Sequence, residues 1–577
     1  MHQQHSFHIP VMGIGYTLDT PLKVSRYGIS SVISLVDDIL LEKLRKMYAE
    51  KYKLDFQPIP DKEDDARAKR ITAYLNLMHD LCTWEFEQML RNGPQDPDYQ
   101  KAMDLLPPNH TAAQLQMGSI DVNVMTKVDR ENFRNKEKLP TMYNDAHAAV
   151  RGFANSKLQS SIILSAGMNP RLYSYLESFE DFYPDAEGNI KKKIVLKVSD
   201  YRSALIQGKF LAKKGLWVSE YRIESGLNCG GHAFATDGYL LGPILQEFKE
   251  KRIELTNSVF DLLSSSLANT DRQIPTKQLP LRISAQGGIG TAAEHQFFLD
   301  QYGLDSVGWG TPFLLVPEAT VVDAKTLNQL VLAKEKDLYL SGISPLGVEF
   351  NNLRMNTKDT QKDQLIKKGR PGSACPKKFL ALNKDFKNTG VCTASREYQN
   401  EKIKELIKED VSAEDYLVRF KEITEKSCIC VGLGTSTLIH YDLDRKREGD
   451  GVSICPGPNL AYFSKVMSLR EMVGHIYGRN NVIEQSDRPH AFIKELNLYL
   501  DYLEKQLKNT HDVNSKTFKY LNTFAENLQA GIHYYQELIT KEMIDSQIQN
   551  GLCAGNLRLQ GLKKRIEALE TLTEPIN

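Results

Sequence analysis

The chain lacks the charge imbalance that marks many nucleic-acid-binding proteins. Its 577 residues contain 73 Lys plus Arg and 73 Asp plus Glu, so the formal net charge is zero. No block of like charge forms a tail, and no basic field covers the whole chain. The composition therefore predicts no nucleic-acid partner.

Long apolar runs and dense cysteine are also missing. No stretch of about 18 consecutive apolar residues is present, so no membrane-spanning helix or membrane partner is expected. The opening residues, Met1-His2-Gln3-Gln4-His5, lack the basic and apolar regions of a signal peptide. Eight cysteines in 577 residues are too sparse for a disulfide scaffold. These absences predict a cytoplasmic protein.

Two strand ends that run into glycine carry the strongest local signal. Residues 283–290 read ISAQGGIG, and a helix is expected from residue 291 to 302. A second segment ends in Gly310-Thr311, 22 residues after Gly288. Glycine lets backbone amides approach an anion closely, and the N-terminus of a following helix adds partial positive charge. A phosphate site after the seventh and eighth strands recurs in (β/α)8 barrels, so the pair predicts a phosphorylated ligand.

Short β-like segments alternate with helical stretches through the first 310 residues, which is typical of a parallel α/β fold. There are eight such segments, the number that closes a TIM barrel. They are predicted at residues 8–14, 29–35, 119–128, 161–166, 193–198, 216–223, 281–285 and 306–310.

Two parts of the chain exceed a minimal barrel. The charged stretch at about residues 37–110 predicts a helical insertion after the second strand. Beyond the barrel at 1–325, we expect a cysteine-containing extension at 326–462 and a helical region at 463–577. Apolar residues at helical spacing between 463 and 572 favour packing on the barrel or on a second subunit, as in a homodimer. The predicted fold class is therefore an α/β (β/α)8 TIM barrel with a large, mostly helical C-terminal extension.

Four segments of the chain resemble the nitronate monooxygenase (2-nitropropane dioxygenase-like) family of FMN-dependent TIM barrels, to which flavin enoyl-ACP reductases are related. The segments are 8–15 (HIPVMGIG), 224–232 (ESGLNCGGH), 284–290 and 310–313, and Pro317-Glu318 also follows the family pattern. The likeness covers roughly residues 8–320. Asn228 and Cys229 interrupt the family's Glu-Ala-Gly-Gly-His segment, and Trp309 is bulkier than the usual residue there.

The resemblance implies FMN as the cofactor, held by eleven residues. These are Met12, Gly13, Asn123, Lys197, Gly230, Gly231, Gln286, Gly287, Gly288, Gly310 and Thr311. The amides near the paired glycines and Thr311 would hold the phosphate. The Lys197 ammonium would reach flavin N1 or a phosphate oxygen, since a cation near N1 raises the flavin potential. The alternative for Lys197 is a salt bridge within the barrel.

His232 is the candidate acid or base, because the resemblance places it on a glycine-rich loop beside the flavin. An imidazole titrates near neutrality and can take a proton α to a nitro or carbonyl group. The alternative is a structural loop histidine. Cys229 is interpreted as a small buried apolar residue in preference to a nucleophile.

Five cysteines fall within 81 residues of the extension, whereas the other 496 residues hold three. They are Cys375, Cys392, Cys428, Cys430 and Cys455. Iron–sulfur clusters take four thiolates, often from irregular backbone containing Pro and Gly. No Cys-x-x-Cys pair is present, however, and no spacing matches a standard zinc or cluster motif. An iron–sulfur cluster, a zinc ion and unliganded buried cysteines all stay open at this point.

The leading hypothesis is an FMN-dependent oxidoreductase similar to nitronate monooxygenases, acting on a small-molecule substrate. A second hypothesis is a flavin reductase of an activated C=C bond, with NAD(P)H as donor and an acyl-carrier substrate. Because no Gly-x-Gly-x-x-Gly motif is present, a nicotinamide would bind transiently over the flavin. A third is a non-catalytic scaffold that binds flavin or a phosphorylated metabolite.

Overall fold

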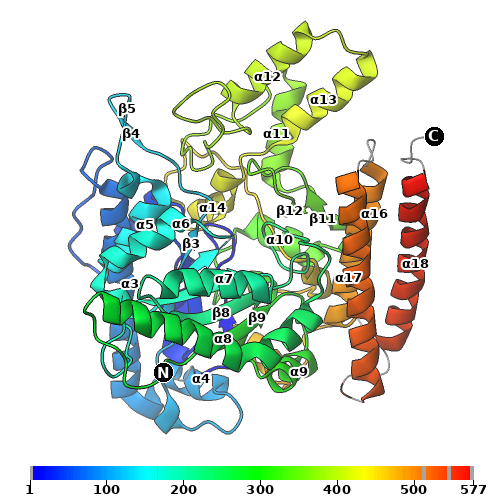
Figure 1. The fold of residues 1–577 in the computed structure, drawn as a ribbon. Helices are drawn as coiled ribbons and strands as arrows, with labels where there is room; N and C mark the ends of the chain where they lie inside the picture. Colours follow the sequence, from blue (N-terminus) through cyan, green and yellow to red (C-terminus); the bar gives the residue numbers. More distant parts are fainter. Residues whose placement is uncertain are drawn as a thin grey trace.

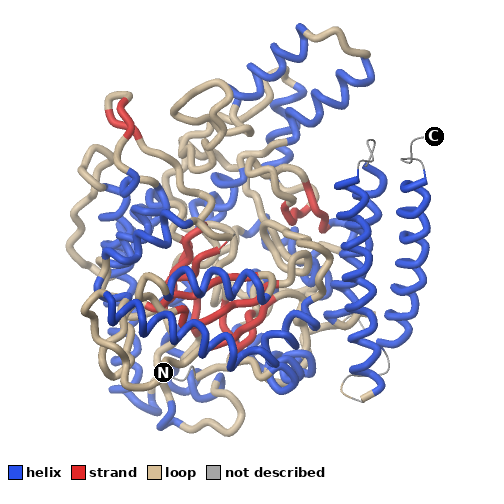
Figure 2. Tube along the Cα trace, viewed as in Figure 1, coloured by secondary structure: helices blue, strands red, loops and turns tan. Residues whose placement is uncertain are grey.

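The computed structural model describes residues 4–165, 167–484, 487–509, 515–541, 543 and 548–571. Its centre is a closed barrel of eight parallel strands in the order β1-β10-β9-β8-β7-β6-β3-β2. Figure 2 shows these strands surrounded by helices. The barrel strands are β1 (Phe7–Ile9), β2 (Ser30–Ser34), β3 (Ile120–Met125), β6 (Ser161–Ser165), β7 (Lys193–Val198), β8 (Val218–Glu224), β9 (Arg282–Gln286) and β10 (Ser306–Gly308).

All eight predicted strands are therefore confirmed, and β7 has the predicted bounds. The others begin or end within a few residues of the prediction, and β1 and β3 are shorter than expected. Ala166, the last residue of the fourth predicted strand, lies outside the described residues. Parallel strands pair in close register, for example Ser306 with Ser284 and Val307 with Ala285. The carboxyl ends of neighbouring strands consequently meet at one face of the barrel.

Helices that follow the barrel strands cover the barrel (Figure 1). Side chains cap the N-termini of most of them. Thr291 caps α9 by accepting a hydrogen bond from the Glu294 amide, and Glu294 reaches back to the Thr291 amide. These helices are α5 (Asp145–Ala154), α6 (Pro170–Tyr175), α7 (Tyr201–Ala212), α8 (Leu241–Asn269), α9 (Ala292–Tyr302) and α10 (Ala324–Leu332).

The predicted helical insertion after the second strand is present. It contains α2 (Asp38–Lys51), α3 (Ala66–Asn92) and α4 (Pro97–Leu105) between β2 and β3. A buried face of α3 packs on α5, where the Thr72 hydroxyl donates to the Gly152 carbonyl at 2.9 Å. A short hairpin of β4 (Phe133–Arg134) and β5 (Glu137–Lys138) follows β3.

The extension after the barrel is mostly helical, as predicted, with a small two-stranded sheet. Helices α12 and α13 form an arm that projects away from the strands (Figure 1). The elements are β11 (Leu338–Ser341), β12 (Phe350–Leu353), α11 (Thr357–Lys367), α12 (Arg396–Lys408), α13 (Ala413–Glu425), α14 (Ile429–His440), η9 (Pro458–Tyr462) and α15 (Leu469–Ile476).

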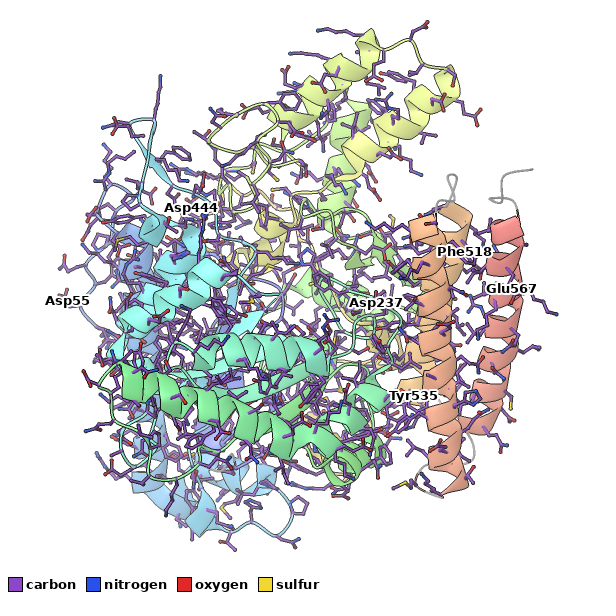
Figure 3. The ribbon with its side chains drawn as sticks, in the orientation of Figure 1. Asp55, Asp237, Asp444, Phe518, Tyr535 and Glu567 are labelled. Carbon is purple, nitrogen blue, oxygen red and sulfur yellow. The ribbon has the colours of Figure 1, made fainter. Side chains whose placement is uncertain are left out.

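Three long helices, α16 (Ala491–Asn509), α17 (Ser515–Thr540) and α18 (Gln549–Thr571), stand side by side at one side of the barrel. Tyr535 lies on the barrel-facing side of α17 (Figure 3), where its ring stacks on Phe492 and its hydroxyl accepts from the Gly242 amide at 3.2 Å. A contiguous buried apolar core runs from Phe7 in β1 to Ile566 in α18. The domain boundaries near residues 325 and 462 stay predictions, and residues 1–3 and 572–577 lie outside the described residues.

Within the described part of the chain, no helix combines the length and apolar character needed to cross a membrane.

Candidate functional site

A cavity of about 110 Å³ opens at the carboxyl ends of the barrel strands. Nine of the eleven predicted cofactor-binding residues line it. They are Met12, Gly13, Gly230, Gly231, Gln286, Gly287, Gly288, Gly310 and Thr311.

The loop after β9 forms one wall through the predicted glycine pair. Gly287 and Gly288 have φ of 127° and 76°, which side-chain-bearing residues rarely adopt. A Cβ at Gly288 would lie 1.9 Å from the Asn228 Nδ2 atom, and a Cβ at Gly287 would lie 2.7 Å from the Ser225 Cβ. Only glycine fits this backbone, so this wall exposes main chain rather than side chain to the cavity.

The loop after β10 forms the facing wall, with Gly310 and Thr311 at the start of a 3-10 turn, η7 (Thr311–Leu315). The Thr311 Oγ1 atom accepts a hydrogen bond from the Gly457 amide at 3.0 Å. Since a hydroxyl both donates and accepts, its hydrogen is left for a ligand.

A segment of the extension, residues 453–459, also borders the cavity. Its residues Ile454, Cys455 and Asn459 join the lining. The Cys455 carbonyl accepts from the Gly231 amide at 3.1 Å. The Gly231 amide, predicted to serve the cofactor, is thus already paired within the protein. Sequence reasoning assigned Cys455 of this segment to a possible metal site with the other clustered cysteines and did not place the segment at the cavity; the run Pro456-Gly457-Pro458 signals an irregular loop but not its location.

Arg488 ties the region before α16 to the same wall. Its guanidinium donates to both oxygens of the Glu294 carboxylate, each at 2.8 Å, and to the Gly288 carbonyl at 2.8 Å. Both side chains are buried. The Glu294 carboxylate also accepts from the Gly290 amide at 2.8 Å, so it occupies the N-terminus of α9 that was expected to face a phosphate. Burial opposes ionisation of Glu294, but the Arg488 charge prevails and lowers its pKa.

Two buried polar atoms of the lining have no hydrogen-bond partner in the described part of the chain. They are the Gln286 Oε1 and Asn228 Oδ1 atoms. The Gln286 Nε2 atom donates to Glu224 Oε1 at 2.8 Å, which fixes the orientation of the carboxamide. Buried polar atoms without partners are costly, so these two acceptors fit a ligand that brings hydrogen-bond donors. Together with the glycine wall, they fit FMN, whose phosphate takes amides and whose ring and ribityl chain carry N–H and O–H groups.

Lys197 and Asn123 are the two predicted cofactor residues outside the lining. The Lys197 ammonium lies 2.7 Å from Glu224 Oε2, and Glu224 lines the cavity. Lys197 therefore acts on the cavity through Glu224. Asn123 is buried in the barrel wall and donates to the Ile163 carbonyl at 3.2 Å.

His232 follows the lining residue Gly231, but its side chain turns toward the extension. The Nε2 atom lies 2.7 Å from the Ser344 Oγ atom, and the ring packs edge-on against Phe350 with centroids 4.9 Å apart. Burial lowers the pKa of His232 to about 4, aided by the charges of Lys127 and Lys197. The imidazole is thus neutral near pH 7 and can accept a proton.

The thiols at the cavity are protonated. Cys229 donates weakly to the Gln286 carbonyl, with Sγ and O 3.4 Å apart. Burial raises the pKa of Cys229 well above its ordinary value, and the Glu224 charge adds to this. Burial raises the pKa of Cys455 to about 12. A thiol held neutral is a poor nucleophile. Cys229 itself is half-buried, so its interpretation as a small apolar residue stays a prediction.

The structure divides the five cysteines of the extension into two groups. Cys455 lies at the cavity, beside Gly231. The other four side chains, Cys375, Cys392, Cys428 and Cys430, adjoin one another and are buried. We call these four the four-cysteine cluster.

Glu495 of α16 is a buried carboxyl that sequence reasoning missed. It accepts from the Ser225 hydroxyl at 2.5 Å and from the Leu241 amide at 2.9 Å, directly behind the loop after β8. Burial raises the pKa of Glu495 to about 7. It stands among the apolar residues of a helical pattern, where one carboxyl gives no distinctive signal.

The closed parallel barrel with a cavity at the carboxyl ends of its strands defines a TIM-barrel protein of the α/β class. No family model matches the chain, and neither does any curated protein.

Among solved structures, the chain is similar to FabK from Thermotoga maritima, with 12% identity, a TM-score of 0.36, and coverage of 87% of this chain and 96% of that one. It is also similar to the enoyl reductase domain of MlnA from Bacillus amyloliquefaciens, with 13% identity, a TM-score of 0.38, and coverage of 87% and 96%. A third is nitroalkane oxidase from Streptomyces ansochromogenes, with 9% identity, a TM-score of 0.35, and coverage of 82% and 95%. The closed barrel of eight parallel strands confirms the fold class predicted from the sequence.

Proposed function

We propose that the protein is an FMN-dependent oxidoreductase, similar to nitronate monooxygenases, that oxidises a small molecule at the barrel cavity. The observation that carries this proposal is the pair of facing loops, Gly287-Gly288 and Gly310-Thr311, around a cavity with two unpartnered polar atoms. FMN would supply the two-electron acceptor.

The protein's own groups would bind and orient the cofactor. The main chain of Gly287, Gly288 and Gly310 and the Thr311 hydroxyl would hold the phosphate. Gln286, anchored through Glu224, would accept a hydrogen bond from the bound group. Residues 453–459 would exclude water from their side of the cavity. Lys197 would neutralise the charge of the lining residue Glu224 through their ion pair.

His232 would move the proton. Because the pKa of His232 is lowered, the imidazole is neutral near pH 7. The neutral imidazole is the form that accepts a proton from a carbon α to a nitro group. Ser344 would orient the ring through the Nε2 atom. For this role the substrate must reach His232 from the side of β12, next to Gly231.

The test is anaerobic reduction of the bound flavin by a short-chain nitroalkane. His232→Gln should slow the reduction by about 10²- to 10⁴-fold, the usual contribution of a general base. Bound flavin should stay unchanged, and His533→Gln, an exposed change on α17, should have no effect. Because the His232 pKa is lowered to about 4, the wild-type rate per enzyme should hold from pH 8 down to about pH 5 and fall as pH drops through 4. Reduction of the His232→Gln variant at the wild-type rate would reject the assignment.

A second candidate function is reduction of an activated C=C bond on an acyl carrier, with NAD(P)H as donor. It is favoured by a groove that carries basic side chains on the carboxyl-terminal side of the barrel. These are Arg130, Lys136, Lys378, Lys387 and Arg396, five cations against the two lining carboxylates Glu131 and Glu397. Arg130 pairs with Asp145 and Lys387 with Glu397, which leaves a smaller net positive charge. Such a groove suits an acidic carrier protein. NADPH oxidation that requires a carrier-bound enoyl thioester, and slows in Lys378→Glu, would support this function over nitroalkane oxidation.

The homodimer through α16–α18 and the cytoplasmic location also stay proposals. Light scattering of the purified protein tests the first, because a dimer doubles the scattering mass.

A further inference from the structure

A second cavity, of about 1750 Å³, opens at the amino ends of the barrel strands, at the opposite end of the barrel from the first. Its lining includes the first residues of β2, β6, β7 and β9, which are Ser30, Ser161, Lys193 and Arg282. The reaction proposed above uses no group at this end. The floor of this second cavity nevertheless contains charged side chains.

Three polar residues of the floor stand in one row on neighbouring strands. Ser161 of β6 pairs in register with Lys193 of β7, and the Ser161 amide donates to the Asp121 Oδ1 atom of β3 at 3.0 Å. Since neighbouring strands lie about 4.8 Å apart, the backbones of Asp121 and Lys193 are about 10 Å apart. Ser161 lies between them.

Asp121 is a buried carboxyl with one oxygen unused. The residue is 4% exposed and lines the cavity. Its Oδ1 atom accepts from the Ser119 hydroxyl at 2.6 Å and from the Ser161 amide, whereas Oδ2 accepts no hydrogen bond from the described residues. Burial raises the pKa of Asp121, and the nearby Arg222 charge does not overcome this. A cationic donor at Oδ2 would stabilise the ionised form.

Lys193 carries the opposite charge, also without a partner. Its ammonium forms no ion pair and no hydrogen bond within the part of the chain that the structure describes, and the residue is half-buried. The two lysines before it differ. Lys191 pairs with Asp181 at 3.1 Å, and Lys192 donates to the Ser156 carbonyl at 2.7 Å. Of three consecutive lysines, only Lys193 leaves its charge for a ligand.

The other acidic and basic side chains of this lining are balanced within the protein. Arg252 pairs with Asp305 at 2.8 Å, and Glu220 pairs with Arg222 at 2.9 Å. Burial opposes the ionisation of Glu220, but the Arg222 and Arg282 charges prevail and lower its pKa to about 2. The floor thus offers one carboxyl oxygen and one ammonium of opposite charge to a ligand.

A metal ion does not fit this floor. No three His, Cys, Asp or Glu side chains of the described residues are placed to hold one, so the metal site predicted at the clustered cysteines also finds no support. A simple anion would leave Asp121 without a donor, and a simple amine would leave Lys193 without an acceptor. A small zwitterion satisfies both, because two charge-assisted contacts of about 2.8 Å and the few ångströms between its own charges span such a gap.

We propose that the amino end of the barrel binds a free amino acid, with its ammonium on Asp121 and its carboxylate on Lys193. The apolar residues Leu158, Ile190 and Leu281 line the same cavity, which favours an apolar side chain on the ligand. A free amino acid is smaller than the cavity, so such a side chain has room. This inference does not depend on FMN.

The test is isothermal titration calorimetry of the full-length protein with L-leucine, L-methionine and L-phenylalanine. At least one should bind. 3-Methylbutylamine and 4-methylpentanoate, which lack the carboxylate and the ammonium of leucine, should each bind at least about tenfold more weakly than leucine, since a hydrogen bond to a charged group is lost.

Two variants test the two ends of the ligand. Asp121→Asn keeps the Oδ1 acceptor for Ser119 and Ser161, and Lys193→Met keeps the aliphatic stem. Each should weaken binding of the tightest amino acid at least about tenfold. Lys191→Met is the matched control, because this lysine lines the same cavity but is already paired, and it should bind as the wild type does.

Three results would overturn the proposal. The first is no heat of binding with any of the three amino acids at about 10 mM, where a site of millimolar Kd would fill. The second is an analogue that binds as tightly as leucine. The third is unchanged affinity in both variants. If Asp121→Asn does not fold, Lys193→Met and the analogues on the wild type still decide the outcome.

Discussion

The cavity wall and the four-cysteine cluster are two regions of the molecule built in different ways. The wall consists of main chain from loops that follow neighbouring strands, so the order of the barrel alone brings Gly288 and Gly310 together. The four-cysteine cluster consists of side chains from separate loops of the extension. The first site depends on topology, and the second depends on residue type. Yet the extension also contributes to the first site, through residues 453–459 and Arg488.

The largest expected effect tests this dependence of the barrel wall on the extension. Arg488→Met leaves the Glu294 carboxylate buried without a cation, which should lower the free energy of unfolding by about 3–5 kcal/mol. Denaturant unfolding followed by circular dichroism measures the change. Adding Glu294→Gln should recover most of the loss, because the uncompensated charge is then removed. If Arg488→Met lowers the free energy of unfolding by less than about 1 kcal/mol, the barrel wall does not depend on Arg488 of the extension for its stability.

A second test uses Glu495, which connects α16 to the loop after β8. Its pKa is raised to about 7 in the folded protein, above an unfolded value near 4.5, so the folded state holds its proton longer. The stability contribution is therefore full below pH 4.5 and is lost as pH rises to 7, by about 3 kcal/mol.

Glu495→Gln removes this titration and can still hydrogen-bond to Leu241 and Ser225. The variant should unfold at a higher denaturant concentration than the wild type at pH 8, with the difference shrinking toward pH 5. A difference independent of pH would mean that Glu495 is ionised throughout.

The smallest expected effect tests whether the main chain of the cavity wall contributes to FMN binding. Gly288→Ala should weaken FMN binding about hundredfold, or about 2.7 kcal/mol, since the added Cβ meets the Asn228 side chain. Asn228 cannot yield freely, because its Nδ2 atom donates to the Ala491 carbonyl. Gly303→Ala is the matched control, with φ of 61° and no atom within 4 Å of its Cβ. Titration of the apoprotein with FMN measures both, and equal affinities in the two variants would contradict the role of Gly288.

The barrel was predictable because its signals are local. Strand 193–198 and helix 291–302 each follow from a short apolar pattern with a nearby cap or turn, and the glycine pair marks its own backbone conformation. The positions of residues 453–459 and of Arg488 at the cavity were not predictable in the same way. These residues follow Thr311 by more than 140 positions, and their contacts with the barrel loops are single hydrogen bonds that produce no periodic pattern in the sequence.

The cysteines show the same limit. Their density in residues 375–455 pointed to a shared site, but spacing did not reveal that Cys455 belongs with the cavity and the other four with one another. His232 was chosen from its motif. Its orientation toward Ser344 and Phe350 depends on a bridge with β12, a strand more than 100 residues later in the chain, which the motif does not indicate.

The most direct test of the account is the flavin released by acid from the purified protein, before and after incubation with excess FMN. The account predicts about one FMN per chain in the wild type and in Gly303→Ala, and less in Gly288→Ala as purified, with part of that deficit restored by excess FMN. A colourless protein that takes up no FMN would contradict the central claim that the barrel cavity is a flavin site.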